Sequence, residues 1–220
     1  MSLEQKFQIL INKLNAGNFD EVIFEAIQLN KKHPEQEVFY NLLSLAYQGK
    51  GDYQSSIKLL ENALRRSKNN INFLNNLGLS YYKKNDFLSA EKYFLNVLKL
   101  NPRYINTMNN LGSLYQNINR FDEAEKILRK SLEINSEVIQ TNYNLASLLQ
   151  SIGKFDEAKK IFLKLMKLDE NFTKADLSYA ILENYQKNSE HLNIMEKKLK
   201  NENLNKSNIK DLSFALGKAY

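Results

Sequence analysis

The sequence predicts an all-α protein, an α-α superhelix of six helix-turn-helix repeats followed by the start of a seventh. Three observations predict this fold class. Residue types recur with a period of 34, each repeat contains two apolar patterns with steps of three and four residues, and the 220 residues include only 7 glycines and 2 prolines. Apolar residues at such steps share one face of a helix, so each repeat should form two amphipathic helices.

The period is clearest in two stretches, NNLGLSYYKKNDF from Asn75 and NNLGSLYQNINRF from Asn109. Counting from Leu3 gives an array over residues 3–206. Its repeats are 3–36, 37–70, 71–104, 105–138, 139–172 and a degenerate 173–206. Agreement at many positions of these repeats indicates internal duplication of one structural element.

The first helix of each repeat is expected from mostly apolar residues at positions 4, 7 and 11. Position 8 is small from the second repeat onward, so a neighbouring helix can approach closely there. Position 15 is glycine or asparagine, the residue types that most easily reach the positive φ of a helix end. The residues at position 15 are Gly17, Gly51, Asn85, Asn119 and Gly153.

The second helix is expected from the pattern at positions 20, 24 and 27. Position 20 is small in most repeats, and acidic residues often occupy positions 18 and 19, where they favour the first turn of a helix. Pro34 and Pro102 both fall at position 32 and should lie just beyond the end of the second helix.

The sixth repeat lacks the later alanine and proline landmarks. Its helices are expected near Lys174–Gln186 and Glu190–Asn201. Residues 207–220 end in DLSFALGKAY and match the front of a repeat once more, which leaves two interpretations. The segment is either a capping helix or the first helix of a seventh repeat in a natural chain that continues, and apolar residues such as Phe214 and Tyr220 favour the second.

The segment Phe73–Tyr104, FLNNLGLSYYKKNDFLSAEKYFLNVLKLNPRY, resembles the tetratricopeptide repeat, which has small, large and proline residues at these positions. The resemblance covers Leu3 to about Lys206 and implies a fold but no chemistry. The opening repeats and FALGKAY also resemble the N-terminal repeat region of bacterial sulfotransferases. This chain has no glycine- and serine-rich phosphosulfate loop, so that second resemblance implies catalysis beyond residue 220.

Composition excludes several function classes. The formal net charge of +6 comes from lysines scattered among glutamates, a pattern typical of a solvated surface, so nucleic acid is disfavoured as a partner. The absence of cysteine excludes disulfides and thiolate chemistry. No apolar run reaches the roughly 18 residues of a membrane span. We therefore expect a cytoplasmic protein.

Candidate catalytic residues do not cluster in the sequence. His33 and His191 lie in different repeats and are both expected to be exposed, and the recurring acidic pairs are explained by helix starts. No nucleophile–base constellation, phosphate-binding loop or dinucleotide fingerprint is visible. The sequence predicts no enzyme activity, no cofactor and no metal in this chain, although a catalytic domain could follow it.

Amide side chains recur in the first helices. The family resemblance implies that positions 2, 5, 6, 9, 12 and 13 face a concave groove, similar to the asparagine ladder of O-linked N-acetylglucosamine transferase. A primary amide both donates and accepts, so it can bind the main chain of an extended peptide. An asparagine-rich composition is the alternative explanation. The predicted groove residues are Asn41, Asn72, Asn75, Asn76, Tyr82, Asn106, Asn109, Asn110, Gln116, Gln140, Tyr143, Asn144 and Gln150.

The predicted function is a protein–protein interaction scaffold that binds an extended peptide or protein segment. The alternative is a substrate-recruiting arm of a sulfotransferase or glycosyltransferase whose catalytic domain is absent here. An RNA-binding helical-repeat protein ranks last, because related arrays lack the small residues at positions 8 and 20. A carboxylate clamp is disfavoured, because positions 2, 5 and 6 are neutral in the central repeats. The sequence does not identify the partner or the oligomeric state.

Overall fold

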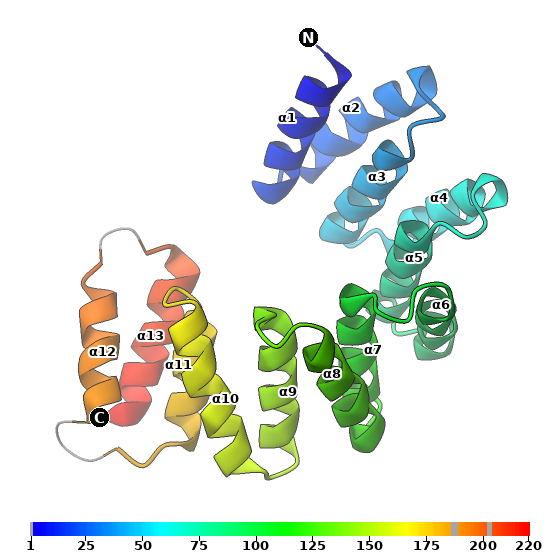
Figure 1. Ribbon diagram of the computed structural model, residues 1–220. Helices are drawn as coiled ribbons and strands as arrows, with labels where there is room; N and C mark the ends of the chain where they lie inside the picture. Colours follow the sequence, from blue (N-terminus) through cyan, green and yellow to red (C-terminus); the bar gives the residue numbers. More distant parts are fainter. Residues whose placement is uncertain (1, 186–188, 202–203) are drawn as a thin grey trace. The chain divides into compact units, whose positions relative to one another are not determined.

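The computed structural model describes residues 2–185, 189–201 and 204–220 (Figure 1). In these residues every regular element is an α-helix, which confirms the predicted fold class. The helices are α1 (Leu3–Asn15), α2 (Phe19–Lys32), α3 (Glu37–Lys50), α4 (Tyr53–Arg66), α5 (Ile71–Lys83), α6 (Phe87–Leu100), α7 (Ile105–Asn117), α8 (Phe121–Ile134), α9 (Ile139–Ser151), α10 (Phe155–Leu168), α11 (Thr173–Leu182), α12 (Glu190–Leu199) and α13 (Lys206–Ala219).

The sequence period reappears as the spacing of the helices. The odd-numbered helices from α1 to α11 each begin 34 residues after the previous one. The second helices from α2 to α10 keep the same step and begin with an aromatic residue. We use "first helix" and "second helix" for the two members of each pair.

The chain forms two compact lobes, residues 1–114 and residues 115–220. In the N-terminal lobe, consecutive helices from α1 to α6 pack against each other in sequence order (Figure 1). One core cluster is built around Leu10, Val22 and Phe39, and the next around Leu60 and Phe73. Each pair therefore buries its apolar face against the following pair, as expected for stacked repeats.

The turn between the two helices of a repeat is closed as predicted. Asn85 and Asn119 have φ of 64° and 60°, and the three glycines at position 15 have φ of 80° or 81°. After α5, the N–H of Asp86 donates to the carbonyl of Tyr81 at 2.9 Å, and the N–H of Asn85 donates to that of Tyr82 at 3.0 Å. This pair of bonds is a Schellman motif, and it satisfies carbonyls that the helix end leaves open.

Close approach of the paired helices depends on the small residue at position 8. A Cβ atom built on Gly78 of α5 would lie 2.7 Å from two ring carbons of Phe94 of α6. Phe94 is fully buried, and so is Ala90 one turn earlier on α6. The glycine therefore leaves the space that the aromatic ring fills, which agrees with the predicted role of position 8.

The sixth pair, in the C-terminal lobe, differs from the expectation. α11 ends at Leu182, because Glu183 has an extended backbone with φ −94° and ψ 142°. The predicted end, Gln186, lies outside the described residues. α12 ends at Leu199 rather than Asn201. α13 packs on both α11 and α12, and it buries Leu212, Ala215 and Leu216.

One prediction about the histidines is wrong. The side chain of His33 is 42% exposed, as expected. His191, by contrast, is only 8% exposed, because it lies on the inner face of α12 against Asp176, Tyr179 and Tyr185. In the described ranges, no helix combines the length and apolar character of a membrane span.

Candidate peptide-binding face

In the N-terminal lobe, hydrogen-bonded asparagines connect three successive first helices. Nδ2 of Asn76 on α5 donates to Oδ1 of Asn41 on α3 at 3.1 Å. Nδ2 of Asn110 on α7 donates to Oδ1 of Asn75 on α5 at 3.1 Å. Each bond joins position 6 of one repeat to position 5 of the repeat before it. We call Asn41, Asn75, Asn76 and Asn110 the amide ladder.

Neighbouring polar side chains support the amide ladder. Oγ1 of Thr107 donates to the same oxygen of Asn75 at 2.7 Å, within the buried interface of α5 and α7. Nε2 of Gln48 on α3 donates to the main-chain carbonyl of Asn76 at 3.0 Å and to Oγ of Ser80 at 2.8 Å. The face of the first helices is therefore joined by side-chain bonds as well as by apolar packing.

The asparagines of this face differ in exposure. Asn75 and Asn109, both at position 5, are 8% and 7% exposed. The side chains at position 6 of the same helices are half-buried, and those at position 2 are exposed. At position 2, Oδ1 of Asn72 accepts a bond of 2.8 Å from the hydroxyl of Tyr104. Position 5 thus forms an inner layer, while positions 2 and 6 are accessible to a ligand.

Tyr82, at position 12 of the third repeat, has an aromatic and basic environment. The ring centroid of Tyr82 lies 6.0 Å from the ring centroid of Phe87. Nζ of Lys83 lies 5.8 Å from the Tyr82 centroid. Burial raises the pKa of the Tyr82 hydroxyl, so the group stays protonated and can donate a hydrogen bond at neutral pH.

The predicted residues of the C-terminal lobe lie on first helices as well. On α9, Nε2 of the exposed Gln140 donates to Oδ1 of Asn144 at 2.7 Å. The ring of Tyr143 packs edge-on against Phe172 at 5.3 Å between centroids. Gln116 on α7 and Gln150 on α9 are half-buried.

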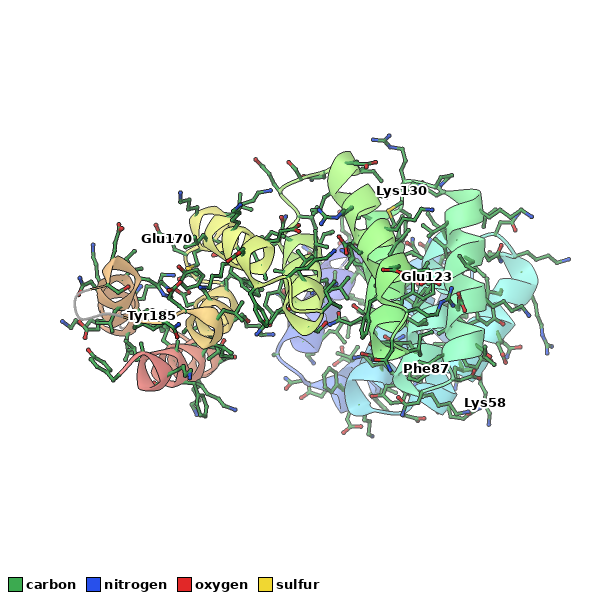
Figure 2. The ribbon with its side chains drawn as sticks, turned by 90° about the horizontal axis from the view of Figure 1, so that it is seen from below. Lys58, Phe87, Glu123, Lys130, Glu170 and Tyr185 are labelled. Carbon is green, nitrogen blue, oxygen red and sulfur yellow. The ribbon has the colours of Figure 1, made fainter. Side chains whose placement is uncertain are left out.

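Charged residues concentrate on the second helices. Glu125 on α8 pairs with Arg129 at 2.7 Å and with Lys154 at 2.9 Å, and Arg129 also reaches Glu157 on α10 at 2.9 Å. Burial acts to raise the pKa of Glu125, but the bonds from Lys154 and Arg129 outweigh it and hold the pKa below its usual range. Figure 2 shows Glu123 and Lys130 of α8 among the charged side chains of this lobe. The first helices α7 and α9, which contain no charged residue, therefore differ chemically from the ion-paired second helices α8 and α10.

Sequence reasoning found the amides but not their mutual bonds. It placed positions 5 and 6 together in the groove, whereas Asn41 and Asn75 at position 5 accept hydrogen bonds from the following repeat. It also missed Thr107, which completes the bonds to Asn75. At position 3 the second and third repeats carry the buried phenylalanines Phe39 and Phe73, whereas the fourth repeat carries a threonine. This change to a polar residue was the signal available in the sequence. In the described parts of the chain, no three His, Cys, Asp or Glu residues are grouped to hold a metal ion.

Comparison with known proteins agrees with this architecture. Two family models, both described as tetratricopeptide repeat, match residues 70–137 in one case and residues 38–70 and 139–172 in the other. No curated protein matches the chain significantly.

Three solved structures illustrate the similarity. The Thermus thermophilus protein TTC0263, a thermophilic TPR protein, is 17% identical, with 82% of this chain and 98% of that chain covered and a TM-score of 0.74. PilF of Pseudomonas aeruginosa is 18% identical, with coverages of 81% and 82% and a TM-score of 0.67. MamA is 19% identical, with coverages of 80% and 92% and a TM-score of 0.57. At these identities the likeness concerns the fold alone.

Proposed function

This chain belongs to the tetratricopeptide repeat family, and we propose that it binds an extended peptide or protein segment through the amides of its first helices. Proteins of this family are generally non-catalytic scaffolds for protein–protein interaction. The amide ladder is the observation that carries the finer proposal, because it places side chains with both donors and acceptors on neighbouring first helices.

The chemistry of a primary amide suits this role. Asn76 and Asn110 each use one N–H in the bonds of the ladder, and an amide nitrogen carries two. Both side chains are half-buried, so they are fixed in position yet reachable. Bonds to a peptide main chain would hold a partner without reading its side chains.

The spacing of the repeats also fits an extended peptide. Packed neighbouring helices lie about 10 Å apart, and a strand advances about 3.3 Å per residue. One amide from each repeat would therefore meet about every third peptide residue. The buried Asn75, which accepts bonds from Thr107 and Asn110, serves in this proposal to orient its neighbours. The equally buried Asn109 has a side-chain oxygen without a hydrogen-bond partner among the described residues. The peptide contacts in the N-terminal lobe would come from positions 2, 6 and 12. In the C-terminal lobe, taken by itself, the corresponding candidates include Gln140, Asn144 and Gln150.

A triple variant tests the proposal. Partners are captured from cell extract on the immobilised full chain and identified by mass spectrometry. The change of Asn76, Asn110 and Asn144 to alanine should abolish capture of these partners while circular dichroism shows nearly unchanged helicity. Loss of one hydrogen bond typically lowers the free energy of unfolding by about 1 kcal/mol, so a reduced melting temperature is expected as well.

A matched control changes three exposed asparagines of second helices, Asn62, Asn96 and Asn193, to alanine. This control should capture the same partners as the parent. Equal capture by the parent and by the ladder variant would contradict the proposal and would favour asparagine-rich composition as the explanation of the pattern.

A further inference from the structure

The C-terminal lobe contains a cleft between two second helices, on residues that the amide ladder does not use. The cleft has a volume of about 1000 Å³ and lies between one face of α10 and one face of α12, with Tyr179 of α11 also lining it. Its walls carry large apolar side chains that remain exposed, since Leu163 on α10 is 40% exposed and Ile194 on α12 is 41% exposed. Met166 extends the apolar wall of α10 by one turn.

A buried polar cluster fixes the wall that α12 contributes. Asp176 of α11 is fully buried, and Nζ of Lys198 donates to its two carboxylate oxygens at 3.0 and 2.9 Å. Nε2 of His191 lies 3.2 Å from Oδ1 of Asp176, and its Nδ1 lies 2.6 Å from the hydroxyl of Tyr185. His191 therefore bridges the Asp176 carboxylate and the Tyr185 hydroxyl through its two ring nitrogens. Figure 2 shows Tyr185 beside α11 and α12.

This cluster has a consequence for the cleft. His191 and Lys198 line the cleft, and both side chains are bound by the carboxylate of the buried Asp176. Burying charges costs more free energy than apolar packing of similar volume, so the cluster is a poor device for stability alone. It does fix the rotation of α12 and the placement of its side chains, as a preorganised binding surface requires.

The charges along the rim are unevenly placed. α10 and α12 run in the same direction, so their C-terminal turns lie at the same end of the cleft (Figure 1). Lys167 and Lys197 stand at that end on opposite walls and form no ion pair within the described residues. Glu170 follows α10 at the same end, and Glu190 begins α12 at the other. Lys198 is neutralised by Asp176, which leaves a net positive charge at the C-terminal end.

We propose that this cleft binds a short amphipathic helix of a partner protein, with its apolar stripe between α10 and α12 and its acidic end at Lys167 and Lys197. A helix fits better than an extended peptide. The lining residues within the helices follow helical steps, 163, 166 and 167 on α10 and 190, 191, 194, 197 and 198 on α12, and residues 170 and 201 lie just beyond the two helix ends. Two such ridges form a groove for the ridge of a third helix. Helical walls offer no free main-chain groups with which a strand could pair.

The apolar stripe and the acidic end have separate tasks. Leu163, Ile194 and the ring of Tyr179 would lose water on contact with leucine-sized side chains, and burial of apolar area supplies most of the affinity. The two lysines would orient the helix and disfavour partners with a basic end, because like charges repel. This surface is independent of the first-helix amides and so does not rest on the function proposed above.

The test uses the full chain and a yeast-displayed library of 14-residue helical peptides. One helical face of the library varies among Leu, Ile, Met, Phe and Ala, and the flanking positions vary among Glu, Lys and Gln. The parent chain should enrich peptides with a bulky apolar stripe and glutamates at one end. Ile194→Glu and Leu163→Glu should each reduce that enrichment at least tenfold, while circular dichroism shows unchanged helicity because both side chains are partly exposed.

Charge exchange provides the sharper outcome. The double variant Lys167→Glu, Lys197→Glu should enrich peptides that carry lysine in place of glutamate. Leu95→Glu, on the exposed face of α6, is the matched control and should keep the parental preference. The ladder variant of Asn76, Asn110 and Asn144 should keep it too, which separates this proposal from the first. Three results would each overturn the proposal: enrichment of no peptides by the parent chain, enrichment of the parental peptides by the charge-exchange variant, or enrichment of the parental peptides by Ile194→Glu.

Discussion

Substitution of Gly78 by alanine tests the closest contact between paired helices. The new Cβ would lie 2.7 Å from Cδ1 and Cε1 of Phe94 and 3.3 Å from Cζ. Distances under 3.0 Å require a shift, and because Phe94 is fully buried, its ring can shift only against its neighbours in the protein interior. Overpacking of this kind typically costs about 1–3 kcal/mol.

Helix propensity acts in the opposite direction. Glycine in a helix interior is about 0.8–1 kcal/mol less favourable than alanine, so alanine gains that amount wherever space allows. At Gly78 the packing cost is the larger effect, and the expected net loss of unfolding free energy is up to about 2 kcal/mol. Gly217 of α13 is the matched control, because outside the adjacent backbone of its own helix no atom lies within 4 Å of its added Cβ. Gly217→Ala should therefore stabilise the protein by about 0.5–1 kcal/mol.

Urea denaturation followed by circular dichroism measures both changes. A Phe94→Leu background provides a second check, since the smaller side chain frees space. The double variant should lose less than the sum of the two single losses, with a coupling of about 0.5–3 kcal/mol. If Gly78→Ala raised the midpoint as much as Gly217→Ala does, the argument for close approach at position 8 would be refuted.

Three further predictions concern the turn, the ion pairs and the buried cluster. Asn85→Ala should lower the free energy of unfolding by about 1–2 kcal/mol, because alanine disfavours the φ of 64°, whereas Asn85→Gly should not; equal urea midpoints would contradict this. The pKa of Glu125 is lowered from 4.5, so its pairing stabilises the fold above that pH and is lost as the pH falls through the folded-state value. Melting temperatures of Glu125→Gln should accordingly fall less steeply below pH 4.5 than those of the parent. Lys198→Ala should cost about 3–5 kcal/mol by thermal or urea unfolding, because it leaves the buried Asp176 carboxylate without its bidentate partner. The exposed neighbour Lys197→Ala should change stability by less than about 0.5 kcal/mol, and similar losses for both would exclude the role of the pair.

The sequence predicted the fold because the information for it is local. Glycine or asparagine at position 15, aromatic residues at position 17 and apolar residues at helical steps each report on a few neighbouring residues. Because the period is 34 residues, the same local pattern occurs in several repeats, and each occurrence supports the others. Helix starts such as Ile71 and Ile105 could therefore be read from the chain alone.

The hydrogen bonds and the burial of the candidate site residues depend on residues that are far apart in the sequence. The bond between Asn76 and Asn41 joins side chains 35 residues apart, and its existence depends on the register of two packed helices. His191 is buried because Asp176 and Tyr185 surround it, although the flanking sequence of α12 reads as a polar surface. The early end of α11 is likewise a feature of the degenerate sixth repeat, where the period no longer provides a comparison.

Side chains of the amide ladder join adjacent repeats, and in the proposed function the same side chains contact the ligand. A partner that took the N–H of Asn76 away from Asn41 would loosen α5 from α3, whereas one that used the second N–H would leave the joint closed. Under the proposed function, ligand binding and the stiffness of the N-terminal lobe would therefore be coupled. A substitution in the amide ladder that altered ligand preference would therefore also alter the strength of the contact between adjacent first helices.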